Sequence, residues 1–201
     1  MSISIRYRMV VAPRKTLTRG DWAAAGLAAL VEGGPDVVRI EPVAARLGTT
    51  KGSAYWHFTD RADLLRAVLD LWVAKHTVAI RDRVEADGGT ARERLKRLLD
   101  IVSAAAEQSP ADMLLVASAD ADVRAAVVEA TQLRVAYVER LIREDGTPGR
   151  EARSRAVLAY AAYLGHASLT AAVPGLVPHR RADRRRMEES LLAMALPGVT
   201  R

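Results

Sequence analysis

The chain has 201 residues, of which half are apolar, a net charge of +6 and no cysteine. This length and apolar content allow one sizeable domain or two small ones, and they argue against a disordered chain. The lack of cysteine excludes disulfides, thiolate metal sites and cysteine catalysis. The first fifteen residues contain no uninterrupted apolar run, so we expect no signal peptide and a cytoplasmic protein.

Positive charge is concentrated at the beginning of the chain. Residues 1–20 contain Arg6, Arg8, Arg14, Lys15 and Arg19 and no acidic residue. We therefore expect residues 1–16 to form a basic N-terminal arm. Such an arm favours a polyanionic partner, although a solvated cationic tail would also explain it.

Apolar residues recur with a period near 3.6 and strand signals are almost absent, so the chain is predicted to be all-α, with about nine helices. A first helix should begin after Thr18, with Asp21 completing a capping box, and end at the breakers in residues 33–35. A short second helix should carry Glu41 in its first turn and close at Gly48 in the left-handed conformation.

The third predicted helix is the stretch GTTKGSAYWHF, residues 48–58. Helical spacing predicts that the residue before this stretch and three positions within it face inward: Leu47, Thr50, Ala54 and Phe58. A long fourth helix should begin after Thr59 or Asp60 and end before residues 86–89. Later helical segments are predicted at 91–107, 110–118, 120–144, 150–173 and 181–195.

Residues 156–178 carry no charged side chain and are long enough to span a membrane as a helix. Their alanine and glycine content, together with Pro174 and Pro178, instead favours a closely packed helix in a core or a subunit contact. A membrane-associated helical protein is kept as an alternative.

Two short helices joined by residues 47–50, with a third helix before them, match a helix-turn-helix unit, whose second short helix enters the major groove of DNA. Small polar residues at its start would let the backbone approach base edges. Lys51 can donate to guanine or phosphate, and the polar tips of Tyr55 and His57 can reach phosphates. Trp56 can pack its ring against a sugar edge or a thymine methyl group.

Residues 17–72 resemble the N-terminal domain of the tetracycline-repressor (TetR) family of bacterial transcription regulators. The resemblance depends on a motif whose positions are Gly48, Lys51, Gly52, Tyr55, His57, Phe58, Asp60, Arg61 and Leu64. It implies a DNA-binding domain at residues 17–62 and an effector-binding and dimerisation domain at residues 63–201.

The resemblance and the residue chemistry together predict one set of DNA contacts: Arg14, Lys15, Arg39, Thr49, Thr50, Lys51, Gly52, Ser53, Tyr55, Trp56, His57 and Arg61. The sequence departs from the family at Ile40 and Glu41, where members often carry a phosphate-binding Thr or Ser. Glu41 would repel phosphate unless it is turned aside, and Arg39 can substitute.

For the C-terminal domain the resemblance implies a homodimer formed by the last two helices, and a pocket for a small apolar or amphipathic effector. The candidate pocket residues are Trp72, Met113, Leu114, Tyr137, Leu141, Tyr160, Tyr163 and His166. No cofactor or metal site is expected, and the chain lacks HExxH, nucleophile-elbow and phosphate-loop motifs, so no enzyme is expected.

The resulting hypothesis is a dimeric, sequence-specific regulator of transcription that binds a palindromic operator in double-stranded DNA. The resemblance favours a repressor that a small molecule releases from DNA. A regulator that binds DNA without responding to a ligand is the main alternative.

Overall fold

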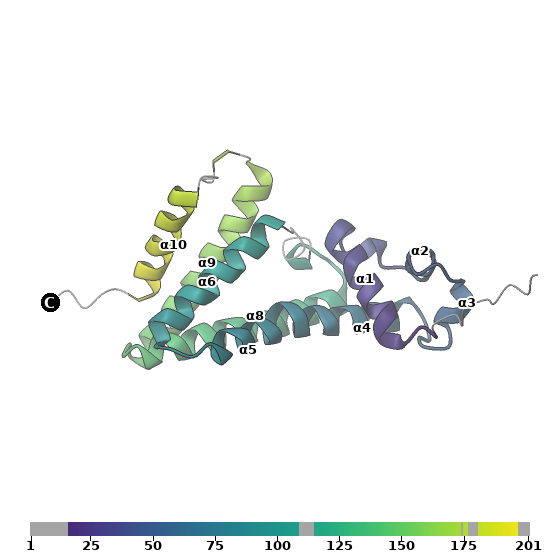
Figure 1. Cartoon of the computed structure of the whole chain (residues 1–201), viewed down its shortest axis with the longest axis horizontal. Coiled ribbons are helices and arrows are strands. Elements are labelled where there is room, and N and C mark those ends of the chain that lie inside the picture. The colour runs from purple at the N-terminus through teal and green to yellow at the C-terminus, as the bar shows by residue number, and fades with distance from the viewer. Residues whose placement is uncertain (1–15, 109–114, 174, 177–180, 197–201) are drawn as a thin grey trace, which may run out of the picture.

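A computed structural model of the chain describes residues 16–108, 115–173, 175–176 and 181–196. These residues form helices and no strand, which confirms the predicted all-α class. The helices make an elongated molecule with a small head at one end and a larger body at the other (Figure 1). Within the described residues, no helix is long and apolar enough to cross a membrane.

The head begins with α1, Arg19–Gly33, whose predicted capping box is present: the Thr18 side chain accepts from the Asp21 amide, and the Asp21 carboxylate accepts from the Thr18 amide. A 3₁₀ turn, η1 (Pro35–Val37), and α2 (Ile40–Arg46) follow. Gly48 then takes φ 64°, the left-handed conformation predicted for the end of α2.

The third helix is shorter than predicted. α3 covers only Lys51–Ala54, and the chain continues as a turn in which the amides of His57 and Phe58 both donate to the Ala54 carbonyl, at 2.8 and 2.9 Å. Ala54 and Phe58 are buried as expected, and Leu47 is half-buried. Thr50 is exposed, so its predicted inward orientation is wrong: it lies before the first helical turn, where helical spacing does not apply.

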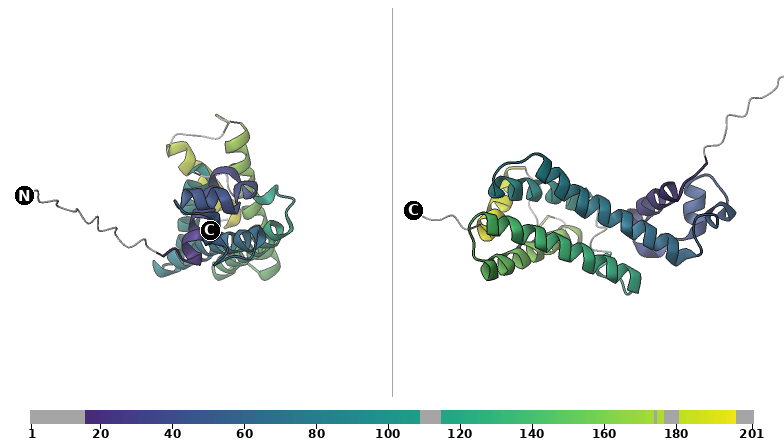
Figure 2. Two further views of the ribbon diagram at one scale, coloured as in Figure 1. Left: turned by 90° about the vertical axis from the view of Figure 1, so that its right-hand side faces the viewer. Right: turned by 90° about the horizontal axis from the view of Figure 1, so that it is seen from below.

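A single long helical rod connects the head to the body. It consists of α4 (Arg61–Val73), a π-helical turn η2 (Ala74–Val78) and α5 (Ala79–Ala86). The Asp60 side chain caps its start by accepting from the Asp63 amide, and the rod ends at Ala86, one residue later than predicted. Figure 2 shows the rod running without a break from the head into the body.

The body contains α6 (Ala91–Gln108), α8 (Ala121–Glu144), α9 (Gly149–Ala172) and α10 (Arg181–Ala195), close to the predicted segments. Most of the predicted helix at 110–118 lies outside the described residues. α8 packs along the rod and against α9, and α10 covers α6 and α9 (Figure 1).

Two hydrophobic clusters lie along the rod. In the head, the apolar faces of α1 and α2 pack on α4 around Trp22, Leu30 and Leu65, all fully or almost fully buried. In the body, Val84 of α5 packs with α6, α8, α9 and α10 around Leu141. The rod therefore contributes side chains to both clusters.

Two ion pairs also join the head to the body. Arg61 lies 3.9 Å from Asp120, and Arg66 lies 3.6 Å from Asp122, so the first turns of α4 reach the first turn of α8. Asp120 is also the N-cap of α8. These pairs are partly exposed, so we expect them to orient the head more than to stabilise it.

The close approach of α1 and α4 requires a glycine at position 26. A Cβ atom built on Gly26 would overlap Cγ2 of Val68. We expect Gly26→Ala to lower the free energy of unfolding by about 1–3 kcal/mol, because overpacking outweighs the gain in helix propensity. Urea unfolding should show the loss, and adding Val68→Ala should recover part of it.

Gly20→Ala is the matched control, because Gly20 is exposed on the same helix and a Cβ there would meet only Thr18 Oγ1, at 3.6 Å. This variant should be neutral or slightly stabilising. Equal losses for the two substitutions would contradict the packing explanation.

Candidate nucleic-acid interface and ligand cavity

α3 lies at the tip of the head, at the far end of the molecule from α10 (Figure 1). The turn before it is fixed by the Thr49 amide, which donates to the Ala44 carbonyl at 3.0 Å. Thr50, Lys51 and Gly52 are exposed at the start of α3, and Thr49 and Ser53 are half-buried beside them. The structure thus brings together the small polar residues predicted to approach bases.

Two large aromatic side chains are left outside the core next to α3. Trp56 is 88% exposed and Tyr55 is 57% exposed, whereas Ala54 and Phe58 on either side are buried. The Phe58 ring packs edge-on against Trp22 at a centroid distance of 6.4 Å. Because both flanking residues are anchored in the core, the turn holds Tyr55, Trp56 and half-buried His57 at the surface.

Arg19, a residue that the sequence analysis did not select, holds this turn against α1 and α4. Its guanidinium donates to the His57 carbonyl, pairs with Asp63 at 2.6 Å and lies 4.3 Å from the centroid of the Phe58 ring. Arg19 is thus a positioning residue for the exposed aromatic turn. Its sequence position gave no signal, since it is one of many arginines in a basic segment.

The hydrogen bonds from Arg19 and from the Thr59 amide stabilise the ionised form of Asp63. They lower the pKa of this carboxyl from 3.8 to about 2. The Arg19–Asp63 pair therefore stays ionised throughout the neutral and mildly acidic range.

The basic residues of the head are placed in different ways. The Lys51 ammonium is exposed and lies 3.7 Å from the Glu41 carboxylate, so the unusual acid at the start of α2 shares a surface with Lys51. Arg39 is exposed, and its Nε donates to the Asp36 carbonyl at 2.9 Å. Arg14 and Lys15 lie outside the described residues.

Arg61 points into the head and toward the body. It donates to the carbonyls of Val38 and Pro35, each at 3.0 Å, besides its pairing with Asp120. These contacts engage Nε, Nη2 and Nη1 of the guanidinium. The predicted contact of Arg61 with a phosphate stays a prediction.

A second feature is a cavity of about 230 Å³ in the body, walled by the rod, α6, α8, α9 and α10. Four of the predicted pocket residues line it: Trp72, Tyr137, Tyr160 and Tyr163. Leu141 is instead buried in the body cluster, and His166 on α9 does not line the cavity. Met113 and Leu114 lie outside the described residues.

The polar end of the cavity is built around Arg134 of α8, which the sequence analysis also missed. Its Nε donates to Thr77 Oγ1 at 3.0 Å and its Nη2 donates to the His76 carbonyl at 3.3 Å. Its guanidinium also lies 5.1 Å from the centroid of the Trp72 ring and 3.5 Å from the Tyr160 hydroxyl. Two of these contacts belong to the π-helical turn.

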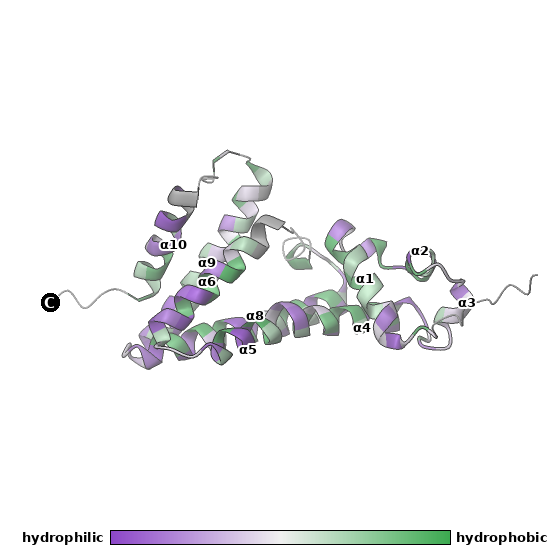
Figure 3. Cartoon of the chain, viewed as in Figure 1, coloured by the Kyte–Doolittle hydropathy of each residue, from purple (hydrophilic) through white to green (hydrophobic). Residues whose placement is uncertain are grey.

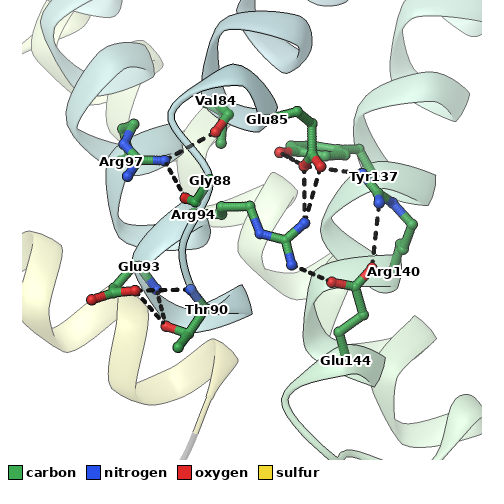
Figure 4. Close-up of polar contacts among 10 residues, drawn as sticks. All are labelled: Val84, Glu85, Gly88, Thr90, Glu93, Arg94, Arg97, Tyr137, Arg140 and Glu144. Carbon is green, nitrogen blue, oxygen red and sulfur yellow. Dashed lines mark hydrogen bonds and ion pairs between the residues drawn. The ribbon is translucent and has the colours of Figure 1, made fainter.

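A polar network fixes the cavity wall near the end of α5 (Figure 4). The Tyr137 hydroxyl donates to Glu85 at 2.6 Å, and Glu85 also pairs with Arg94 at 3.0 Å and Arg140 at 3.1 Å. Arg94 and Arg140 both reach Glu144. The hydrogen bond from Tyr137 and the positive charges of the two arginines lower the pKa of Glu85. Burial and the hydrogen bond to Glu85 raise the pKa of Tyr137.

An exposed short helix on a small helical head matches a helix-turn-helix unit, and this head is joined to a helical body with a cavity. Residues 23–68 match the family model described as bacterial regulatory proteins, tetR family. The match covers the head of the molecule, so this part of the chain is similar to that family of bacterial regulatory proteins. No curated protein matches the chain in sequence.

Solved structures share the fold over most of the chain. A TetR transcriptional regulator from Legionella pneumophila has a TM-score of 0.72 at 15% identity, covering 91% of this chain and 97% of its own. A transcriptional regulator from Rhodococcus sp. Rha1 has a TM-score of 0.70 at 21% identity, with 89% and 94% covered. FadR from Bacillus subtilis, in complex with stearoyl-CoA, has a TM-score of 0.64 at 13% identity, with 90% and 100% covered.

The Asp63 pair predicts a pH-dependent stability. Because the folded-state pKa, about 2, lies below the ordinary value of 3.8, the carboxylate stabilises the fold above pH 4 and loses this effect as the pH falls toward 2. We expect Asp63→Asn to be less stable than the wild type at pH 7, and the difference to narrow between pH 4 and pH 2.

Thermal unfolding across this pH range measures the effect. Asp100→Asn, an exposed acid on α6, is the control and should leave the melting temperature nearly unchanged. A constant difference between Asp63→Asn and the wild type at all pH values would contradict the assignment.

Proposed function

We propose that the protein is a homodimeric, sequence-specific repressor that binds a palindromic operator in the cytoplasm and is released by a small-molecule effector. The observation that carries the DNA-binding step is the anchored turn after α3, which exposes Tyr55 and Trp56 beside Lys51. Large aromatic side chains that are exposed in the free protein can be covered by the sugar–phosphate backbone of a bound duplex. The proposal includes the domain boundaries predicted from the sequence. These are a basic arm at residues 1–16, a DNA-binding domain at residues 17–62 and an effector-binding and dimerisation domain at residues 63–201.

The proposed contacts divide into two kinds. Thr50, Lys51 and Ser53 would face base edges in the major groove, with Thr49 and Gly52 allowing close approach. Tyr55, His57 and Arg39 would contact phosphates and fix the register, with Trp56 against the sugar edge. The basic arm, including Arg14 and Lys15, would follow the duplex backbone.

Support for the dimer comes from the outer face of α9. Leu158 is 57% exposed and Leu169 is 45% exposed, and the small residues Ala161 and Gly165 are exposed between them. The C-terminal half of α9 is mostly pale or green in Figure 3, which marks weakly polar and apolar residues. An apolar stripe with a small residue at its centre suits close packing against a second copy. Such a dimer would place two α3 helices about one duplex turn apart, ~34–36 Å.

Support for effector release comes from the rod. It lines the cavity through Trp72, Thr77 and Ile80, and its N-terminal half forms part of the core of the head. A ligand that prefers one orientation of the rod would shift the population of head positions and so weaken operator binding. FadR from Bacillus subtilis, with stearoyl-CoA bound, is an example of a ligand complex in this fold.

Paired charge variants at the tip test the DNA-binding step. Lys51→Gln should weaken operator binding and flatten the salt slope by about one unit, because one counterion fewer is released. Glu41→Gln should tighten binding about two- to fivefold at low salt, because a surface charge of the wrong sign disappears beside Lys51. Gel-shift titrations on a duplex selected from genomic fragments give both values.

Glu129→Gln is the charge-matched control, since Glu129 is exposed on α8 in the body. It should change affinity little. If the wild-type protein retains no duplex at moderate ionic strength, the DNA-binding proposal is wrong.

Gly165→Leu tests the dimer. A Cβ at position 165 meets no atom within 4 Å in the same chain, and leucine favours helix over glycine by up to ~1 kcal/mol, so the subunit itself should remain folded. In a dimer packed through this stripe, leucine would separate the helices and yield a monomer in sedimentation analysis, with weakened operator binding.

Ala86→Leu, an exposed small-to-large change at the end of α5, should leave the dimer intact. A Gly165→Leu protein that stays dimeric would exclude this face of α9 as the subunit contact.

A further inference from the structure

We propose that the cavity in the body binds an uncharged bicyclic aromatic compound that carries one hydroxyl or carbonyl group, and that the Tyr160 hydroxyl recognises this group. The inference deepens the proposed function, on which its regulatory meaning rests, by naming the chemical class of the effector. It is carried by the size of the cavity, by the aromatic and charged side chains on its walls and by the hydrogen bonds of Tyr160.

The size of the cavity suits two fused rings. An engineered apolar cavity of ~150 Å³ in another protein stays dry and binds benzene, which is a single ring. The present cavity, at about 230 Å³, is roughly half as large again, and α6 makes it apolar on one side through Leu95, Leu98 and Leu99. A single ring would leave part of this space empty and forfeit the contacts of the lining atoms around the void, whereas a second ring fills it.

Aromatic side chains are concentrated on the walls of the cavity. The chain has three Trp, five Tyr and one Phe, and four of these nine rings line the cavity. Trp72 comes from the rod and Tyr137 from α8. Tyr160 and Tyr163 both come from α9, and their rings stack at a centroid distance of 6.0 Å. Because aromatic pairs gain stability beyond the area that they bury, such walls favour a flat aromatic ligand over an aliphatic one of equal size.

The charged side chains on the walls favour an uncharged ligand. None of the described residues that line the cavity is Asp or Glu, so a cation would meet no acid there. The basic residues of the wall already have partners within the protein. Arg81 pairs with Asp82 at 2.8 Å. Neither His76 nor Arg134 is free. An anion would have to displace these partners, and burying a charge without a partner is costly.

The hydroxyl group of Tyr160 is placed to recognise one polar group on the ligand. It lies 3.3 Å from Thr131 Oγ1 and 3.5 Å from Nη1 of Arg134. Hydrogen bonds of these two kinds are usually ~2.7–3.0 Å long, so both contacts are weak. A hydroxyl or carbonyl oxygen of a ligand can therefore form a shorter and stronger bond with Tyr160 than the protein provides.

Binding of 2-naphthol to the full-length protein tests the proposal, with naphthalene, decahydro-2-naphthol and 2-naphthoate as comparison probes. By calorimetry at pH 7, where 2-naphthol is uncharged, we expect it to bind about three- to tenfold more tightly than naphthalene, which lacks the hydrogen bond to Tyr160. The saturated decahydro-2-naphthol should bind about two- to tenfold more weakly than 2-naphthol, because the aromatic contacts are lost. The 2-naphthoate ion should bind at least about tenfold more weakly, because its charge finds no free partner.

Tyr160→Phe should remove the preference for 2-naphthol over naphthalene while keeping the binding of naphthalene, which also shows that the cavity has survived. Tyr163→Phe is the matched control, since it makes the same change on the stacked neighbouring ring, and it should keep the full preference.

The proposal is overturned if 2-naphthol binds the wild type no more tightly than naphthalene, or if decahydro-2-naphthol or 2-naphthoate binds as tightly as 2-naphthol. A preference that persists in Tyr160→Phe, or that Tyr163→Phe abolishes, would overturn it as well. Failure of the proposed function gives a different result. If 2-naphthol binds through Tyr160 but leaves operator affinity unchanged in gel shifts, the aromatic site stands and the effector step falls.

Discussion

The constraint on which the rest of the structure depends is that one helical rod belongs to two hydrophobic cores. Leu65 and Val68 of α4 are buried in the head, whereas Val84 of α5 is buried in the body. The head cannot turn relative to the body unless the rod bends or the packing of α4 against α8 changes. The π-helical turn lies between the two cores and beside the cavity, so a change in its backbone geometry would change the orientation of the head relative to the body.

The surface at the tip of the head is held by the residues next to it. Ala54 and Phe58 are buried on either side of the aromatic turn, and Arg19 ties the carbonyl of His57 to α1 and α4. A turn fixed at three points loses little conformational freedom when it meets a partner, so less binding energy is spent on ordering it. The exposed position of Trp56 is therefore a product of the packing beneath it.

Local chemistry made much of the fold predictable. The capping box of Thr18 and Asp21 and the left-handed Gly48 depend only on near neighbours, and the sequence indicated both. The early end of α3 was not predictable, because helical periodicity continues through residues whose backbone has already turned. The π-helical turn likewise keeps a helical pattern. Arg19 and Arg134 were missed for another reason: their partners come from distant helices, and arginines are common throughout this chain.

The placement of the three tryptophans gives the protein its own optical reporters. Trp22 lies in the core of the head, Trp72 borders the cavity under Arg134, and Trp56 stands almost entirely in water. Iodide should quench the fluorescence of Trp56 and spare the two buried indoles. A partner bound at the tip of the head would therefore protect Trp56 from quenching. Emission from Trp72, beside a guanidinium, would follow occupancy of the cavity. The intrinsic fluorescence of the unlabelled protein can thus report on both the tip of the head and the cavity in the body.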